Sequence, residues 1–379
     1  MKKNLGLYIH IPFCEKKCDY CNFVSFCKKE SDKLEYINAL LSEISLQGKL
    51  YLDRKVDTIF IGGGTPSCLP DGEIQKLLNC VYQNFDVDKD AEITIEANPN
   101  SLSFPKLTEY KSAGINRLSI GLQTYNNKLL KTIGRLHSKK DFDFALKNAK
   151  YAGFQNISVD LILGLPGQKF FDVKRELSHL VKLGVKHISA YGLIVEDGTK
   201  LKQRLDSGDF KLPSEEKSIK MYDYTVKYLK KHGIMRYEVS NFAKAGYESK
   251  HNLKYWSDKE YLGLGLVSSS YVDGARWKNT DNFANYIESV QSGLIPTEEH
   301  EKLSIQERME ERIMLSLRTA HGIDLKRYSQ DFKSDLLQSK QETILSLQQN
   351  GLIEVKNEHL FCTDKGFKFL NQIILKLVD

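Results

Sequence analysis

Cys14, Cys18 and Cys21 lie within eight residues near the start of the chain, where the sequence reads CEKKCDYC. Thiolates are soft ligands that favour iron–sulfur clusters, zinc or Cu(I). A cubane iron–sulfur cluster normally takes four cysteines. A local set of three would leave one iron open to a small molecule, as at metal sites that keep a free position. The segment therefore predicts a reactive metal centre.

Three other interpretations of these cysteines stay open on spacing alone. A disulfide is disfavoured, because nothing in the sequence indicates secretion. A zinc site could use His10 or Cys27 as its fourth ligand, although structural zinc sites usually take two separated ligand pairs. The cysteines could also be unrelated buried side chains.

Apolar strand segments alternate with amphipathic helical segments through the first half of the chain. The strands are predicted near residues 7–11, 58–61, 92–96, 117–121, 158–163 and 187–191. Apolar residues at helical spacing fill the intervals, for example Leu34, Ile37, Leu41 and Ile44. This alternation predicts an α/β fold with a parallel sheet and outer helices. Six such units predict a (β/α)6 partial barrel, whose chemistry would collect at the carboxyl ends of its strands.

Glycines and polar residues mark five consecutive strand ends. The cysteines follow the first strand, and Gly62, Gly63 and Gly64 follow the second. Such a run lets the backbone approach a ligand closely, with N–H groups free to bind it. Later ends carry polar residues, namely Glu96, Gln123 and Asp160. Each feature alone could be a turn or a helix cap, but five in succession predict one shared site.

These motifs together resemble those of the radical S-adenosylmethionine (SAM) enzymes, and in particular the family of oxygen-independent coproporphyrinogen III oxidase and its relatives. The matching segments are residues 8–14, 62–66, 96–99, 121–123, 134–137 and 160–167. The resemblance covers nearly the whole chain. It implies a partial TIM barrel followed by a C-terminal helical domain. It also implies a [4Fe-4S] cluster on Cys14, Cys18 and Cys21, with SAM chelating the remaining iron.

The resemblance also implies which residues contact SAM. They are Tyr8, Tyr20, Gly63, Gly64, Thr65, Glu96, Gln123, Arg135 and Asp160. Carboxylates suit the ribose hydroxyls and the ammonium group of SAM, and a guanidinium suits its carboxylate. The chemistry implied for an active cluster is one-electron reduction of SAM, which gives methionine and a 5′-deoxyadenosyl radical.

Two features separate the branches of this family. The oxidases carry a fourth cysteine two residues after the third, whereas Phe23 occupies that position in this sequence. They also carry a longer segment before the first cysteine, which only 13 residues precede in this chain. Both this pattern and the HNLKYW segment from His251 to Trp256 are similar to the heme-chaperone branch. Members of that branch bind heme and SAM and are thought to deliver heme to an acceptor protein.

His251 is the candidate heme residue, because histidine is a common axial ligand of heme iron. Tyr255 and Trp256 could line an apolar macrocycle. The alternative is a His-Asn pair that hydrogen-bonds a loop, with the two aromatic residues in the core.

Three functions follow from these observations. The leading one is a heme chaperone that binds a [4Fe-4S] cluster, SAM and heme and passes heme to an unknown acceptor protein. The second is a coproporphyrinogen III oxidase that uses the SAM-derived radical for oxidative decarboxylation. The third is a zinc protein with a DNA-binding end.

The chain has 379 residues, and its sequence predicts a globular protein of the cytoplasm. Hydrophobic residues make up 41% and charged residues 27%, which is ordinary for such proteins. No apolar run is long enough for a transmembrane helix, and the N-terminal residues do not resemble a signal peptide. The net charge of +6 is spread along the chain, so no nucleic-acid partner is expected. A homodimer is left open.

The chain is predicted to divide into a barrel over 1–240, an extension over 241–296 that carries the HNLKYW segment, and a C-terminal domain over 297–379. A capping box at Ser304 and Glu307 predicts the first helix of that domain. A second helix is predicted over 333–349, then a hairpin over 352–362 and a last helix. This order resembles a winged helix, a fold that does not by itself fix function.

Overall fold

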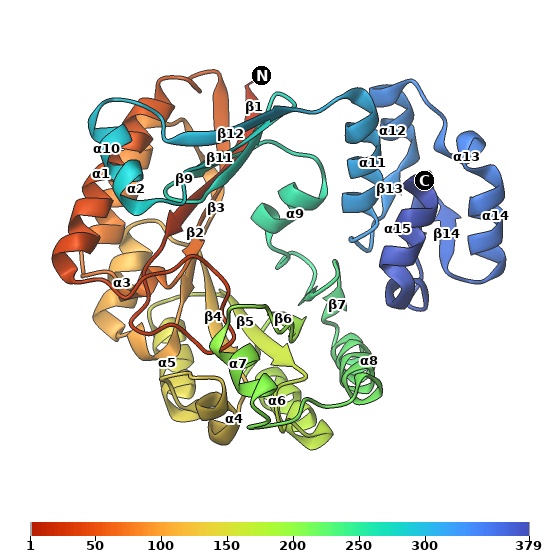
Figure 1. Cartoon of the computed structure of the whole chain (residues 1–379), viewed down its shortest axis with the longest axis horizontal. Coiled ribbons are helices and arrows are strands. Elements are labelled where there is room, and N and C mark those ends of the chain that lie inside the picture. Colours follow the sequence, from red (N-terminus) through yellow and green to blue (C-terminus); the bar gives the residue numbers. More distant parts are fainter. Residues whose placement is uncertain (1, 379) are drawn as a thin grey trace.

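A computed structural model describes residues 2–378, and its largest element is one twelve-stranded sheet. Six parallel strands lie side by side in chain order at its centre (Figure 1). They are β1 (Lys3–Ile11), β2 (Arg54–Gly63), β3 (Val87–Ala97), β4 (Arg117–Gln123), β5 (Asn156–Leu163) and β6 (His187–Gly192). All six predicted strands are present, so the predicted α/β partial barrel is confirmed.

The connecting helices cover the outer face of this sheet (Figure 1). They are α1 (Glu30–Gly48), α2 (Glu73–Asn84), α3 (Phe104–Ser112), α4 (Asn127–Thr132), α5 (Lys139–Tyr151) and α6 (Phe170–Lys182). Two short 3-10 helices, η1 (Pro66–Cys68) and η2 (Pro99–Ser101), follow β2 and β3. Their prolines stand at the first helical position, where the missing N–H costs nothing.

Side chains of the central strands alternate between two environments, because successive residues of a strand point to opposite faces. Apolar residues such as Leu7, Ile95 and Val159 are buried in one core with the outer helices. The intervening positions carry polar residues, which bond to one another across neighbouring strands. Ser158 Oγ, for example, lies 2.7 Å from His187 Nδ1. The inner face of the barrel is therefore largely polar, in contrast to the apolar outer face.

The segment after β6 extends the sheet at both of its edges, which the sequence did not predict. At one edge β8 (Asn241–Ala243) pairs with β6, and β7 (Met235–Arg236) with β8. At the other, β9 (Tyr261–Leu264) pairs with β1 and is followed outward by β10 (Ser269–Val272), β11 (Ala275–Asn279) and β12 (Thr297–Lys302). These additions cover edges that an open barrel would leave unpaired.

Four helices accompany these added strands. They are α7 (Lys200–Asp206), α8 (Glu215–Lys231), α9 (Lys250–Trp256) and α10 (Phe283–Gln291). Helix α9 lies on the inner side of the sheet, opposite the outer helices (Figure 1). The extension is thus part of the barrel sheet. Strand β12 continues that sheet across the predicted division at residue 296, and the three-part division stays a prediction.

The C-terminal unit has its own apolar core. Its elements are α11 (Ile305–Ser316), β13 (Ile323–Asp324), α12 (Leu325–Phe332), α13 (Leu336–Ser339), α14 (Gln341–Gln349), β14 (Ile353–Lys356), β15 (His359–Cys362), η3 (Gly366–Phe369) and α15 (Leu370–Val378). The predicted capping box and hairpin are confirmed. The single helix predicted over 333–349 is wrong, because Lys333 adopts a left-handed conformation and Lys340 leaves helical geometry.

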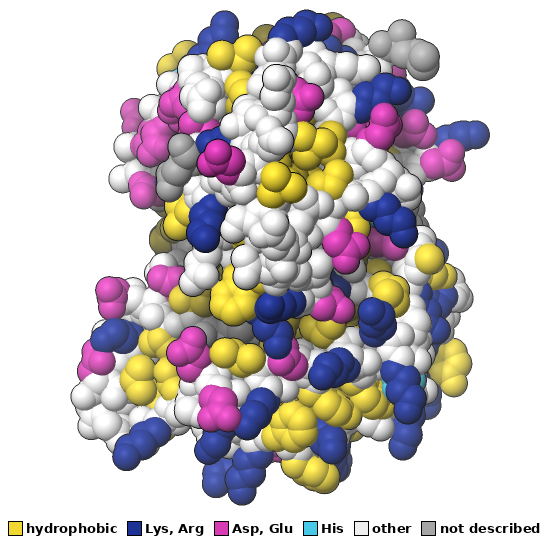
Figure 2. All heavy atoms as spheres, turned by 90° about the vertical axis from the view of Figure 1, so that its right-hand side faces the viewer, with side chains coloured by type: hydrophobic (Ala, Val, Ile, Leu, Met, Phe, Trp, Pro, Cys, Tyr) yellow, Lys and Arg dark blue, Asp and Glu magenta, His cyan; other side chains and the backbone are white. Residues whose placement is uncertain are grey.

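Ion pairs join the C-terminal unit to the barrel. Arg312 contacts Asp258 at 2.5 Å, and Arg236 contacts Asp364 at 2.7 Å. The Arg236 guanidinium also lies 3.7 Å from the centre of the Phe367 ring. Figure 2 shows this side of the molecule, where hydrophobic side chains are scattered among charged ones of both signs. None of the helices within residues 2–378 is both long and apolar enough to cross a bilayer.

Candidate metal and cofactor site

The cysteine loop begins where β1 ends and returns to the strand at Phe26. Phe26 N–H donates to the Pro12 carbonyl at 2.7 Å, and Cys14 N–H donates to the Phe26 carbonyl at 3.0 Å. Cys21 N–H donates to the Cys18 carbonyl at 3.1 Å, which makes a tight turn between these two cysteines. All three thiols are free and half-buried. The loop therefore presents its cysteines at the carboxyl end of the barrel.

Polar groups from two other loops, one after β2 and one between α4 and α5, contact two of these thiols. Cys14 Sγ lies 3.4 Å from Thr65 Oγ1, and Arg135 Nη1 donates to Cys18 Sγ at 3.5 Å. Burial raises the pKa of Cys14 and of Cys21. A coordinating metal would remove these protons outright. Burial also raises the pKa of Tyr20, and the positive charge of Arg135 opposes that rise.

Asn98, which follows β3, connects the loop after β2 with the loop between α4 and α5. Its Nδ2 donates to Thr65 Oγ1 at 3.0 Å, and its Oδ1 accepts from Arg135 Nη2 at 2.5 Å. The same Nη2 donates to the Gly121 carbonyl at 2.7 Å. Thr65 and Arg135, named from the sequence, thus lie together with the cysteines, and Asn98 is the partner that sequence reasoning missed. Asn98 could have been expected at the site, because it follows Glu96 by two residues and stands directly after a strand.

The sequence predicts that the glycine run leaves N–H groups free to bind a ligand. In the structure, the run instead lets the backbone pack closely against neighbouring segments. Gly63 has a φ of +113°, and a Cβ there would lie 2.6 Å from the His10 ring. A Cβ on Gly64 would lie 2.6 Å from the Phe13 carbonyl oxygen. Gly63 N–H donates to Glu96 Oε2 at 3.1 Å, and Gly64 N–H donates to the Ile11 carbonyl at 2.9 Å. Both amides are already bonded within the protein.

Two carboxyl groups from the predicted set, Glu96 on β3 and Asp160 on β5, lie close enough for their charges to interact. Burial, and then the nearby Asp160, raises the pKa of Glu96 to about 8. Burial also raises the pKa of Asp160, which accepts from Ser119 Oγ at 3.2 Å. Arg117, which is only 2% exposed, is the buried cation that opposes them. An arginine within an apolar strand was the sequence signal for it. The pair suits a cationic or hydroxyl-bearing ligand.

Tyr8 and Gln123 complete the predicted set. Tyr8 OH lies 3.0 Å from His10 Nδ1 and its ring packs on Phe60. Gln123 ends β4 with a φ of +64°, and its Nε2 returns to within 2.9 Å of where a Cβ on Gly121 would lie. A side chain at residue 121 would therefore displace Gln123.

His251 lies deeper in the barrel, on α9, and is completely buried. Its Nδ1 lies 2.9 Å from Thr58 Oγ1, its Nε2 lies 2.8 Å from Tyr255 OH, and its ring stacks on Phe60. Burial lowers the pKa of His251 to about 3, so the ring is neutral at physiological pH. Heme ligation by His251 stays a prediction. It would require one of these two hydrogen bonds to break.

The residues present fit an iron–sulfur cluster in their donor chemistry. Three free thiols share one loop, and a guanidinium beside Cys18 can balance the negative charge of thiolates. Among residues 2–378, no three Cys, His, Asp or Glu side chains converge on a single ion position. A cubane cluster takes its cysteines on different irons, so it has no need of such convergence.

Family models match the two parts of the chain. The radical SAM superfamily model matches residues 8–180, and the HemN C-terminal domain model matches residues 303–369. Among solved structures, coproporphyrinogen III oxidase (HemN) from Escherichia coli superposes with a TM-score of 0.87, covering 99% of this chain and 90% of that one. Their sequences are 23% identical, so this likeness concerns the fold.

Two curated relatives match along nearly their whole length. The heme chaperone HemW of Bacillus subtilis is 36% identical over 97% of this chain and 97% of its own. The heme chaperone HemW of Lactococcus lactis is also 36% identical, over 100% of this chain and 98% of its own. The motifs, the barrel and these likenesses agree, and the chain belongs to the HemW heme-chaperone family within the radical SAM superfamily.

Proposed function

We propose that this protein is a heme chaperone that binds a [4Fe-4S] cluster, SAM and heme and transfers heme to an acceptor protein. The observation that carries the proposal is the loop with Cys14, Cys18 and Cys21, whose three thiols are free and half-buried beside Thr65 and Arg135. The heme part of the proposal is based on the relatives of Bacillus subtilis and Lactococcus lactis, which are heme chaperones. A cytoplasmic location is part of the same proposal.

The strand-end residues would bind and orient SAM. Arg135 would neutralise charge near Cys18, while the half-buried Glu96 and Asp160 would accept hydrogen bonds from hydroxyl or ammonium groups. Tyr8, Gly63, Gly64 and Gln123 would shape the surrounding wall. Tyr20 would pack beside the cysteines and limit the access of water. A bound cluster supplies one-electron reduction to such a site.

Phe23 argues against the oxidase function. It occupies the position of the fourth cysteine expected of the oxidases, and its side chain is 70% exposed. Oxygen-independent coproporphyrinogen oxidation is therefore not part of the proposal, although the fold is that of HemN. Heme would be bound with His251 as the candidate ligand, after one of its two hydrogen bonds opens.

A heme titration of the anaerobically reconstituted protein tests this proposal. Absorbance in the Soret region is followed as heme is added, and coproporphyrinogen turnover is assayed in parallel. Saturable binding at about one heme per chain, without turnover, is the expected result. Turnover to protoporphyrinogen without heme binding would overturn the chaperone function in favour of the oxidase.

A transfer assay tests the acceptor step. The heme-loaded protein is mixed with an apo-heme protein, and the two are then separated by size. Heme should move to the acceptor faster than it dissociates into buffer that contains a heme scavenger. Equal rates in the two mixtures would contradict transfer by direct contact.

A further inference from the structure

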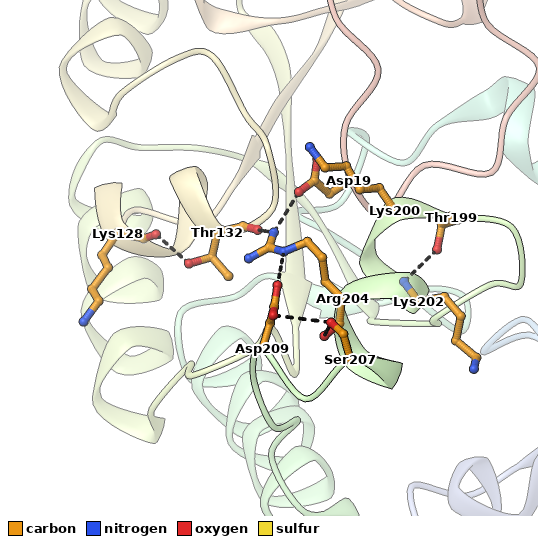
Figure 3. A network of polar contacts seen from close by, with 9 residues as sticks. All are labelled: Asp19, Lys128, Thr132, Thr199, Lys200, Lys202, Arg204, Ser207 and Asp209. Carbon is orange, nitrogen blue, oxygen red and sulfur yellow. Dashed lines mark hydrogen bonds and ion pairs between the residues drawn. The ribbon is translucent and has the colours of Figure 1, made fainter.

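Asp19 is the one acidic residue between the second and third cysteines, and its side chain is 5% exposed. Burying a carboxylate without partners is costly. The contacts of Asp19 therefore identify the segments that hold the cysteine loop in place. Arg204 Nη1, on α7, donates to Asp19 Oδ2 at 2.8 Å. Lys200 Nζ, one turn earlier on the same helix, lies 3.7 Å from Asp19 Oδ1. Figure 3 shows this carboxylate and the guanidinium facing each other.

The backbone of Asp19 is held as firmly as its side chain. Its N–H donates to the Ile133 carbonyl at 3.1 Å, and its carbonyl accepts from Leu201 N–H at 2.6 Å. Gly134 passes so close that a Cβ there would lie 2.6 Å from Asp19 Oδ1. All four polar groups of Asp19 are thus engaged by segments far away in the sequence.

Arg204 links α7 to the end of α4 as well. The same Nη1 donates to the carbonyl of Thr132, the last residue of α4, at 2.7 Å. That carbonyl has no partner within the helix. Asp209 pairs with Arg204 Nε at 3.4 Å (Figure 3). The Phe210 ring lies 5.3 Å from the guanidinium. The guanidinium is therefore fixed on several sides, and its position fixes that of Asp19.

We propose that α7, through Arg204 and Asp19, is a clamp that positions the Cys18–Cys21 turn before a cluster is bound. Arg204 contacts none of the thiols, so it is a positioning residue. The segment that bonds to Asp19 continues directly into Arg135, which contacts Cys18. A turn that is already ordered loses less conformational entropy when it takes up a cluster. This inference rests on the proposed cluster assignment.

The test compares Arg204→Ala with Lys202→Ala. Lys202 lies on the same helix but pairs only with Asp206, at the exposed surface. In cluster-free protein, amide hydrogen exchange at Asp19 and Leu201 should accelerate about tenfold in Arg204→Ala and stay unchanged in Lys202→Ala. In reconstituted protein, iron release to a chelator should accelerate by about tenfold, since partners of metal-binding residues have effects of this size.

Exchange rates in Arg204→Ala equal to those of the wild type would overturn the clamp. The exchange experiment uses cluster-free protein, so it decides this inference even if the protein takes up no iron and the cluster assignment fails. Should Arg204→Ala not fold, Arg204→Lys keeps the charge but loses the forked donors. Exchange in Arg204→Lys should then exceed that of the wild type, and an unchanged rate would again overturn the clamp.

Discussion

The candidate ligand atoms of the cysteine loop and of His251 differ in how strongly other protein groups already bind them. The thiols of Cys14, Cys18 and Cys21 are half-buried and weakly engaged, while the backbone around them is tightly bonded. His251 is completely buried, and both of its ring nitrogens have hydrogen-bond partners. A prepared site has a fixed frame and free ligand atoms. The cysteine loop has both, whereas His251 is bonded as a structural core residue is.

Replacement of His251 by alanine should have the largest effect on stability. It would strand the buried Thr58 hydroxyl and remove the partner of Tyr255, and it would open a cavity beside Phe60. We expect a loss of about 3 kcal/mol in the free energy of unfolding. Urea denaturation of cluster-free protein measures it, with His232→Ala as the control, because His232 is only partly buried at the end of α8.

The heme spectrum of the same His251→Ala protein distinguishes a ligand role of His251 from a structural one. If His251 ligates heme, the Soret band and the affinity change together with stability. An unchanged heme spectrum with lowered stability would mark His251 as structural. Stability equal to that of the wild type would show that the hydrogen bonds to Thr58 and Tyr255 do not hold the core together.

Replacement of Arg135 by glutamine should act on the site more than on the fold. The variant keeps a donor for Asn98 but removes the charge beside Cys18. We expect about a tenfold loss in affinity for iron in reconstitution, as for other residues that support metal ligands. Iron content at limiting iron measures it. Retention of wild-type iron uptake by Arg135→Gln would show that the Cys18 contact is incidental.

Replacement of Glu96 by glutamine should change the pH dependence of stability in the cluster-free protein. The pKa of Glu96 is about 8 in the folded chain and 4.5 when unperturbed. Between these values the folded state holds a proton that the unfolded state has released, so stability falls as pH rises. Glu96→Gln removes this loss.

Thermal unfolding of both proteins from pH 5 to pH 9 provides the measurement. The melting temperature of Glu96→Gln should gain on that of the wild type as pH increases towards 8, and the difference should level off above it. Parallel curves would show that the carboxyl group is ionised in the folded protein.

The central strands could be predicted because each is a run of residues such as Leu7, Ile95 and Val159, which must be buried against helices. Strands β9 to β12 could not, since β9 pairs with β1, more than 250 positions earlier in the chain, and β10 to β12 extend the sheet outward from β9. The cysteine loop was visible in the sequence through its spacing. Its clamp was not, because Asp19 and Arg204 lie 185 positions apart.

The surroundings of His251 were visible only in part. Tyr255 lies four residues later, on the same face of a helix, so its contact with His251 could have been expected. Thr58 lies 193 positions away in the sequence, and it reaches His251 Nδ1 only because the fold places α9 against β2. The choice between ligand and core residue depended on that second partner.

Iron and sulfide content after anaerobic reconstitution tests the central claim most directly, in the wild type and in Cys18→Ser. Cys80→Ser is the control, because Cys80 is a similarly half-buried free cysteine on α2. We expect about four irons per chain in the wild type and the control, and a large loss in Cys18→Ser. A full complement of iron and sulfide in Cys18→Ser would contradict the assignment of the cluster to this loop.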